Sequence, residues 1–469
     1  MSSLRFQSGV SLRSASLALL LAAGCNYSDS ITDAGVADAG VADGGAAVPR
    51  VLAVSATGHD RFYGVTFDPA GRFYAAGVVS EGNVAATADF ETVVARFTAT
   101  GELDTTFGQG GYARRNVVVG LGGEVARGVA VQPGGKVVVV ASIEHVAAGA
   151  DPRDRDIALV RYNADGTRDT GFGVDGVVTL DLSDGQVVGT GYVADAAWGL
   201  TAYSDGRLLV TGAQRRSGGT VADFAVVRLS ADGVRDAAFG ANGVATVNVL
   251  ERTANPRTAT LLPDGGIVGS GYIDDGGVVK PVLFKLTSAG QLDPAFGTAG
   301  IFAPTVLAAV TEAYDAVPQG SSFVTAGYGR NSASESLDWL SLRVSAAGTL
   351  DPTWGTAGVA RLDLARFNDN ARALVALPDN RILMVGGGRP SEANVDGMVA
   401  VLTSAGQPDT TFAPRGLRTF DFGGASDFFW AVALNPARTH VAIVGARGVA
   451  VSAGATTAND DSVVYLLPL

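Results

Sequence analysis

The sequence predicts an all-β protein made of a repeated unit, and two features of the chain support this. A turn motif with the pattern Asp-x-x-aromatic recurs six times along the 469 residues, at intervals of 57 to 67 residues. A regular period of this kind indicates a repeat architecture. Val, Ala and Thr are common and Met is rare, which favours strands over helices. The aromatic residue of the motif stands at Phe107, Phe172, Phe239, Phe296, Trp354 and Phe412.

The second copy shows how strands fill one unit. Its apolar runs are separated by turns at Pro133–Gly135 and Asn163–Gly166, which predicts short antiparallel strands. Four such strands in each unit are typical of a β-propeller blade. The expected strands of this unit are Arg127–Gln132, Lys136–Ile143, Ile157–Tyr162 and Val177–Asp181.

Seven units of this kind are expected. The innermost strand of each unit opens on a large side chain, and these are Tyr63, Arg127, Trp198, Arg257, Tyr314, Arg372 and Trp430. The last unit offers only three strands, whereas Val51–Ala56 is a spare strand before the first unit. If the spare strand joins the last unit, no sheet edge is left open. We therefore expect residues 51–469 to form a seven-bladed β-propeller of four-stranded antiparallel blades, closed by its N-terminal strand. An open solenoid or an eight-bladed ring is the alternative.

The repeat resembles a known family. A strand that ends on Arg, a turn with Gly, and the pattern Leu-Asp-x-x-Phe-Gly-x-x-Gly are similar to the delta-60 repeat of bacterial surface and secreted proteins, over nearly all of 51–469. The resemblance implies a propeller in an extracellular setting. It implies no particular chemistry, because that family has no general assigned activity.

A basic residue precedes each of the first five motif aspartates by eight positions. We expect each pair to form a partly buried, hydrogen-bonded ion pair that caps the turn. Repetition around the ring favours this structural role over a catalytic one. The pairs are Arg96 and Asp104, Arg161 and Asp169, Arg228 and Asp236, Lys285 and Asp293, and Arg343 and Asp351. In the sixth copy Val401 replaces the base and Ala413 replaces the glycine, so that blade is expected to be the weakest.

The N-terminus is expected to be an export signal followed by a tether. Arg5 and Arg13 precede a short apolar run that ends at Cys25, the only cysteine. Leu21-Ala-Ala-Gly-Cys resembles a bacterial lipobox, although Ala22 stands where that motif usually has Leu. We interpret 1–24 as a lipoprotein signal peptide, Cys25 as the lipidation site and 25–50 as a flexible acidic tether. A secretory signal with a chance cysteine is the alternative.

The seven large side chains of the inner strands are the candidate ligand-binding residues. Arg and aromatic residues alternate among them, and they are expected at the mouth of the central channel. Such a set would bind a sugar or an anionic group by stacking and paired hydrogen bonds. The alternative is that Arg stacks on its aromatic neighbours and plugs the channel. Loops of variable length are expected on the same face: Glu81–Asp89, His145–Arg155, Gln214–Asp223, Arg330–Asp338, Arg389–Asp396 and Val449–Asp460.

Several classes of site are disfavoured. A net charge of −12 argues against nucleic-acid binding. The three histidines, His59, His145 and His440, have no ligand spacing, and no nucleophile elbow or phosphate-binding loop occurs. The acidic segment Asp151–Asp156 contains two Arg and is interpreted as a solvated loop rather than a calcium site. No metal, cofactor or catalytic residue is assigned.

These observations favour a lipid-anchored, cell-envelope propeller that does not bind nucleic acid and acts as a monomeric binding or scaffolding module at the outer membrane. Its expected partner is an envelope protein, a peptide or a glycan. Two alternatives stay open, a glycan lyase or hydrolase with its site at the channel mouth, and a purely structural surface component.

Overall fold

The structure is a computed structural model that describes residues 48–56, 58–81, 89–120, 123–144, 154–183, 193–216, 219–363, 367–390, 394–423, 426–449 and 459–469. Throughout these residues the chain is all β, with no α-helix and one short 3-10 turn, η1 (Pro414–Gly416). Within the same ranges, no helix is long and apolar enough to cross a membrane. The all-β prediction is confirmed.

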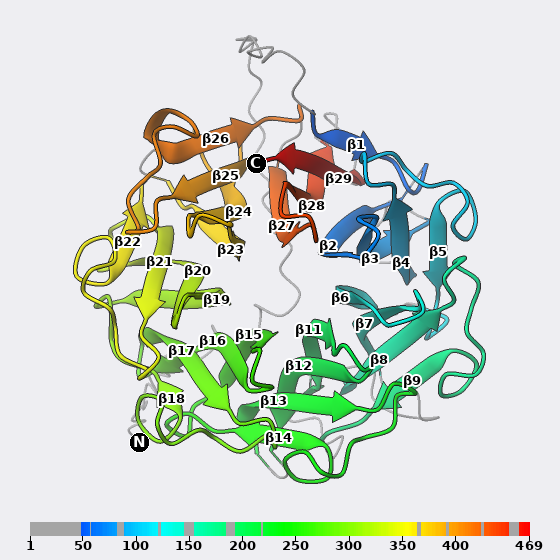
Figure 1. The fold of residues 1–469 in the computed structure, drawn as a ribbon, viewed down its shortest axis with the longest axis horizontal. Coiled ribbons are helices and arrows are strands. Elements are labelled where there is room, and N and C mark those ends of the chain that lie inside the picture. Colours follow the sequence, from blue (N-terminus) through cyan, green and yellow to red (C-terminus); the bar gives the residue numbers. More distant parts are fainter. Residues whose placement is uncertain are drawn as a thin grey trace, which may run out of the picture.

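The strands form antiparallel sheets of four strands that surround a central axis (Figure 1). Three of the four-stranded sheets pair their strands in the order of the chain, and two of them come first here. The first contains β2 (Asp60–Phe67), β3 (Phe73–Ser80), β4 (Phe90–Phe97) and β5 (Tyr112–Arg115). The other contains β11 (Ala196–Ala202), β12 (Leu208–Arg215), β13 (Ala222–Leu229) and β14 (Val244–Val247).

Between them lies a sheet with one additional strand, because the two-residue β10 runs parallel to β8. This sheet contains β6 (Val125–Val131), β7 (Val137–Glu144), β8 (Asp154–Tyr162), β9 (Val177–Leu180) and β10 (Val193–Ala194). Its four main strands match the ranges expected from the sequence to within three residues.

The next two groups of four strands are joined into one eight-stranded sheet by a single parallel pair, Val279 with Val310. The first group is β15 (Ala254–Leu261), β16 (Ile267–Asp275), β17 (Val278–Leu286) and β18 (Ile301–Phe302). The second is β19 (Val310–Gln319), β20 (Ser322–Arg330), β21 (Asp338–Val344) and β22 (Val359–Leu362).

The last two sheets bring the chain back to its start. One contains β23 (Asn370–Ala376), β24 (Ile382–Gly388), β25 (Asp396–Leu402) and β26 (Leu417–Phe420). The other contains β27 (Ser426–Leu434), β28 (His440–Val449), β29 (Asn459–Pro468) and β1 (Arg50–Leu52). β1 pairs antiparallel with β29 and is shorter than the spare strand expected at Val51–Ala56.

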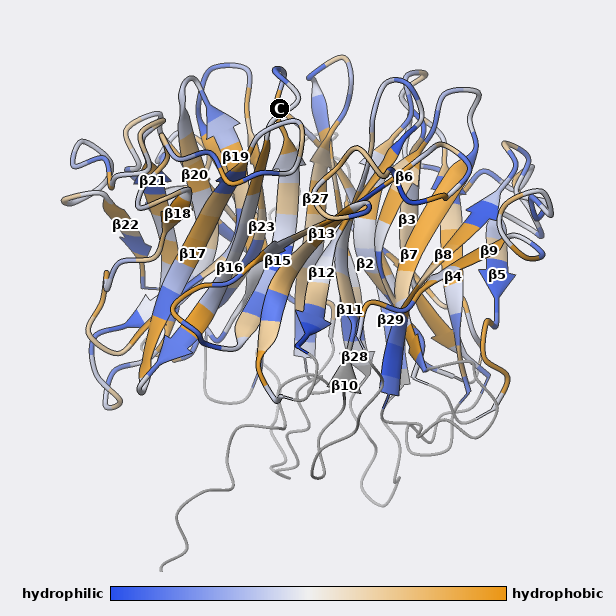
Figure 2. Ribbon diagram, turned by 90° about the horizontal axis from the view of Figure 1, so that it is seen from below, coloured by the Kyte–Doolittle hydropathy of each residue, from blue (hydrophilic) through white to orange (hydrophobic). Residues whose placement is uncertain are grey.

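The core lies between adjacent sheets. Each sheet is covered on both faces, so a middle strand such as β3 is buried along its whole length instead of alternating. Hydrophobic residues accordingly gather along the middle of the strands, as seen from the side (Figure 2). One cluster packs Tyr74 and Phe107 against Val139 and Val160 of the following sheet.

The turn motif forms the joint between adjacent units. All five expected base–aspartate pairs are present, with nitrogen–oxygen distances of 2.7 to 2.9 Å. Arg228, for example, also donates to the backbone carbonyl of Ser288 in the next unit at 2.6 Å and lies over the Phe239 ring. The predicted capping role is confirmed, and the same side chain also links two units.

The aromatic residue of the motif packs against a glycine of the next unit. Phe239 is fully buried, and a Cβ on Gly290 would lie 2.9 Å from its ring. The motif glycine itself, Gly240, has φ +55° and donates its N–H to Ala289 O at 2.9 Å. These contacts explain why the pattern includes glycine at both places.

The sixth copy departs from this geometry for a visible reason. Ala413 stands at the glycine position with φ −164°, so the backbone leaves the left-handed conformation and η1 follows. Asp409 is nevertheless paired, because Arg381 from the β23–β24 turn lies 2.8 Å away and replaces the missing base at Val401.

Candidate functional site

The seven candidate residues all lie on the innermost strands, at one particular backbone feature. Each of these strands contains a β-bulge, where the register with its neighbour shifts by an extra residue. Bulges of this kind turn a side chain away from its usual direction. The residues at the bulges are Tyr63, Arg127, Trp198, Arg257, Tyr314, Arg372 and Trp430.

The sequence prediction for these residues needs one correction. They do not open their strands, because each strand begins two to four residues earlier; β2, for instance, begins at Asp60. The extra length was hidden because the residues that begin these strands, Val125 and Ala254 among them, do not mark a strand start by themselves. The residues therefore lie within the inner strands and not at their first positions.

The seven side chains stack on one another in sequence order, and we call them the axial ring. Arg127 lies 5.3 Å from the ring centroid of Tyr63 and 4.1 Å from that of Trp198. Arg257 lies 4.3 Å from Trp198 and 4.1 Å from Tyr314. These separations are within the range of favourable cation–π contacts.

The remaining contacts complete the axial ring. Arg372 lies 4.2 Å from the ring centroid of Tyr314 and 5.1 Å from that of Trp430. Trp430 meets Tyr63 edge to face at 5.2 Å. Thus every guanidinium has an aromatic residue on both sides, which is the stacking that the plug alternative anticipated.

The three guanidiniums of the axial ring differ in their hydrogen bonds. Arg257 is 6% exposed and donates to Pro256 O, Tyr272 Oη and Tyr314 Oη at 2.9, 3.2 and 2.9 Å. Among the described residues, Arg127 and Arg372 have no hydrogen-bond acceptor and form no ion pair, although the negative charge of the buried Glu312 acts on Arg372 at longer range. Both keep partial exposure. Two positive charges beside the axis therefore have donors that the protein does not use.

Charge repulsion within the axial ring is visible in its electrostatics. Burial lowers the pKa of Arg127 to about 10, and the positive charges of Arg257 and Arg372 contribute in the same direction. Arg127 remains protonated at neutral pH. An anion at the axis would relieve this repulsion.

One side of the axial ring is more polar than the other, which sequence reasoning missed. Tyr272 and Tyr328 follow a glycine at equivalent positions of β16 and β20, and both lie near Arg257 or Arg372. Glu312 is buried on the same side. Burial raises the pKa of Tyr314, but Arg257 and Arg372 outweigh burial and lower it overall. Alignment of the repeats would have revealed the two tyrosines, since other units have small residues there.

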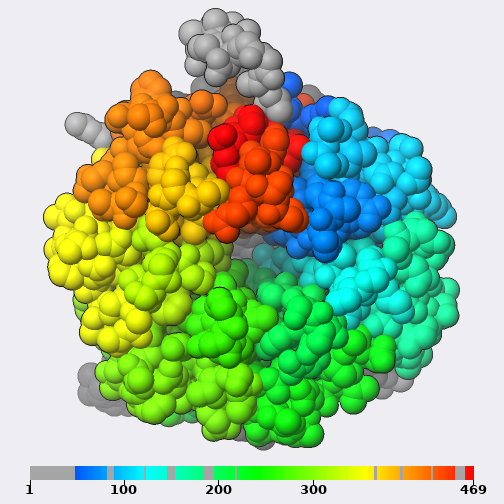
Figure 3. All heavy atoms as spheres, in the orientation of Figure 1, coloured from blue at the N-terminus to red at the C-terminus, as the bar shows by residue number. Residues whose placement is uncertain are grey.

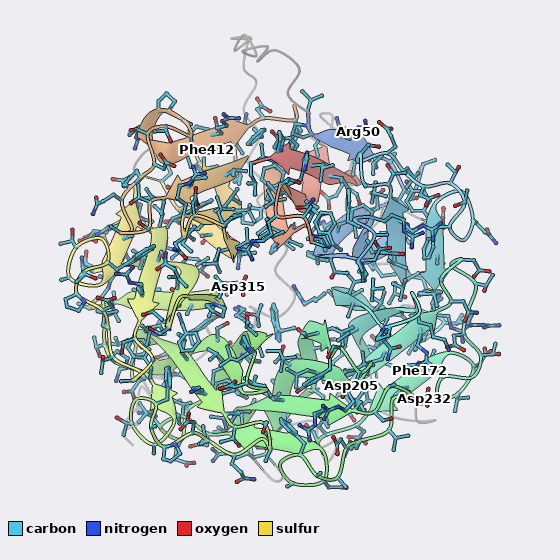
Figure 4. All side chains as sticks on the ribbon, viewed as in Figure 1. Arg50, Phe172, Asp205, Asp232, Asp315 and Phe412 are labelled. Atoms are coloured by element: carbon cyan, nitrogen blue, oxygen red, sulfur yellow. The ribbon has the colours of Figure 1, made fainter. Side chains whose placement is uncertain are left out.

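Asp315 fixes the inner strands beneath the axial ring. Its carboxylate accepts from Thr258 Oγ1 at 2.6 Å and from the backbone N–H of Leu374 at 3.2 Å, so it connects β15, β19 and β23. Figure 4 shows Asp315 beside the axis, whereas Phe172 and Phe412 of the turn motif lie far out. The space-filling view shows a hollow at the axis of the face turned to the reader (Figure 3).

The other sequence assignments fall on scattered or undescribed positions. Cys25, His145 and most of the expected loops lie wholly or partly outside the described residues. His59 contacts Asp460 at 3.3 Å and His440 contacts Thr439 at 2.9 Å, in different surroundings. The acidic segment was not a solvated loop throughout, because Asp154–Asp156 begins β8 and Asp156 is buried.

Comparison with known proteins supports the fold. The segments 132–172, 204–239 and 262–296 each match the model of a family described as a domain of unknown function (DUF5122), beta-propeller, and each match ends on the motif aromatic. No curated protein matches the chain. The polysaccharide lyase Uly1 shares 10% identity, with a TM-score of 0.50 over 87% of this chain and 90% of the lyase.

A second solved structure has a lower score. A mutant of the NanB sialidase from Streptococcus pneumoniae shares 10% identity, with a TM-score of 0.41 over 88% of this chain and 68% of the sialidase. The lyase comparison therefore concerns the fold alone. With the three matched segments and the four-stranded antiparallel sheets, it supports a β-propeller fold built from repeats.

Proposed function

We propose that the chain is a seven-bladed β-propeller, closed by its N-terminal strand, that binds a carboxylate-bearing glycan at the axial ring. Two observations support the blade number and closure. The strands fall into seven groups of four when the eight-stranded sheet is divided at its single parallel pair. The first and last groups are connected by the pairing of β1 with β29 and by contact between β2 and β27.

The unused donors of Arg127 and Arg372 are the observation that carries the binding function. A plug made of side chains would need only the stacking. It would not need three positive charges around one axis, none of which forms an ion pair with a carboxylate among the described residues. Arg binds carboxylates through paired N–H groups, and flat aromatic faces bind sugar rings. An acidic sugar offers both a carboxylate and a ring face. A peptide carboxylate would use the same donors but would not need the aromatic residues.

The proposed setting is the cell envelope, at the outer membrane. The lipobox-like segment before Cys25 supports a lipid anchor, and the acidic tether would hold the propeller away from the bilayer. The protein would act there as a monomeric binding or scaffolding module.

Titration calorimetry of the mature chain with oligouronates, and with neutral oligosaccharides of equal length, tests the proposal. We expect binding of the acidic series, and at least a tenfold weaker affinity in both Arg372→Gln and the triple variant with Arg127, Arg257 and Arg372 changed to Ala. Arg252→Gln is the matched control, because its guanidinium pairs with Asp275 at the surface. If the unaltered protein binds no oligouronate and the Arg variants lose stability, the plug alternative is supported instead.

A glycan-active enzyme is the second candidate, and one observation favours it. Two guanidiniums lower the pKa of Tyr314, which lies on the same side as the buried Glu312. Tyrosine serves as the nucleophile in some glycosidases. Turnover of acidic glycosides that Tyr314→Phe abolishes while leaving binding intact would favour the enzyme. Binding without turnover would favour the module.

A further inference from the structure

An acidic site recurs at the junction between consecutive units. In three units an aspartate lies near the start of the third strand, and a second aspartate follows 25 residues later, just after the fourth strand. A third aspartate lies at the inner strand of the next unit. In each set the carboxylate oxygens lie within 4.8 Å of one another. The sets are Asp156, Asp181 and Asp195; Asp338, Asp363 and Asp369; and Asp396, Asp421 and Asp427.

At the equivalent position of two other units, a cationic side chain of the protein is present. Lys280 occupies the first position in one unit and pairs with Asp275 at 2.7 Å. In another, Asp223 is paired with Arg216 at 2.7 Å, and Asn248 replaces the second acid. Even within the acidic sets, Asp338 is paired with Arg361. The protein thus places a positive charge at this junction repeatedly.

Among the described residues, Asp396 itself has no such charge paired with it. Asp396 is 8% exposed, and within the described part of the chain neither a hydrogen bond nor an ion pair reaches its carboxylate. Thr419 occupies the position that corresponds to Arg361. A mostly buried carboxylate without a partner is unfavourable even where water still reaches it, and two further carboxylates beside it add charge repulsion. Burial and the neighbouring Asp421 raise the pKa of Asp396 to about 6.

The geometry of this set suits a calcium ion. Calcium binds oxygen ligands at about 2.3–2.6 Å, so two ligands of one ion lie at most about 4.6–5.2 Å apart. Asp427 already accepts from the N–H of Phe422 at 2.6 Å and Asp421 from that of Gly423 at 2.7 Å, so the carboxylates are held in place. Asp421 is exposed and leaves a route for the ion.

We propose that Asp396, Asp421 and Asp427 bind a calcium ion that connects β25 and the end of β26 to β27 of the next unit. The ion supplies the positive charge that Lys280, Arg216 and Arg361 supply at equivalent junctions. This replaces the expectation from sequence that the chain has no metal site. That expectation considered only spacings within one segment, whereas these ligands come from three strands.

The test is calcium binding by the mature chain after treatment with EDTA, followed by calorimetric titration through the millimolar range, where extracellular modules bind with Kd of about 10⁻⁴–10⁻³ M. We expect Asp396→Asn and the exposed Asp421→Asn each to lose one bound calcium ion. Asp223→Asn is the matched control and should leave the number unchanged, because Arg216 serves that position. Calcium should also raise the Tm of the unaltered protein more than that of either variant.

The number of bound calcium ions decides whether the proposal holds. Absence of calcium binding by the unaltered protein overturns the proposal, and so does an equal number of bound ions in the protein and in Asp421→Asn. Because Asp421 is exposed, its variant should fold even if Asp396→Asn does not. Without a bound ion, Asp396→Asn should raise the Tm in EDTA, since it removes a buried charge that has no partner.

Discussion

Replacing Arg228 by Met should destabilise the propeller by removing one joint between units. The guanidinium lies 2.8 Å from Asp236, donates to Ser288 O at 2.6 Å in the next unit and covers Phe239. Met keeps much of the side-chain volume, so the substitution removes the charge and its hydrogen bonds while leaving most of the packing.

The size of the effect follows from how exposed the partners are. Removing one partner of a buried ion pair costs about 3–5 kcal/mol. The side chain of Arg228 is 8% exposed but that of Asp236 is 21% exposed, and Arg207 lies 3.6 Å from the same carboxylate. Water and Arg207 would therefore compensate for part of the charge, and we expect a loss of about 2–3 kcal/mol.

Urea denaturation followed by tryptophan fluorescence measures this loss as a change in the free energy of unfolding. Arg252→Met provides the control, because Arg252 pairs with Asp275 at the surface and should contribute at most about 0.5 kcal/mol. If Arg228→Met were no more destabilising than the control, the joint would depend on aromatic packing alone. The role assigned to the motif base would then be wrong.

Three further predictions concern stability. Gly290→Ala should lower the free energy of unfolding by about 2–4 kcal/mol, measured by thermal denaturation, because φ is +77° and the Cβ would lie 2.9 Å from Phe239. Gly276→Ala is the control and should cost about 1 kcal/mol, because φ is +67° but no neighbour lies within 4 Å. Arg381→Ala should destabilise the protein by about 1–2 kcal/mol, because Asp409 would lose its only basic partner among the described residues, and an unchanged urea midpoint would contradict this. Burial raises the pKa of Glu124 to about 7 in the folded protein, so this group makes stability fall as pH rises from about 4 to about 7. Glu124→Gln should flatten the dependence of Tm on pH over that interval, and a parallel curve would show that other groups cause it.

The sequence predicted the outer part of each unit better than the inner part. The base eight residues before each motif aspartate keeps a constant offset, because the two residues lie on one strand–turn segment whose length does not change. The same reasoning failed for Asp409, whose partner Arg381 comes from a different turn and is found only in three dimensions. Val401 correctly marked the sixth copy as different but did not reveal this replacement.

The axial ring could be listed from the sequence but not positioned. The order of Arg and aromatic residues was readable, since each belongs to an equivalent position of the repeat. A β-bulge has no clear sequence signal, because one extra residue in a strand looks like an ordinary shift in the apolar pattern. The acidic junctions were likewise visible as a spacing of 25 residues, but their closure depends on how the next inner strand meets the preceding unit.

Two sets of Arg–aromatic contacts occur in this fold, and their counter-ions separate their roles. At the outer joints, Arg161, Arg228 and Arg343 each lie over a motif ring and have an aspartate within 2.8 Å. At the axis, the same stacking occurs, yet Arg127 and Arg372 form no ion pair with a carboxylate among the described residues. If stacking alone were needed at the axis, the aspartate that accompanies it at these three joints would be expected there too. Its absence leaves the charge for a partner from outside the chain, which is why we place the ligand at the axial ring and not at the repeated turns.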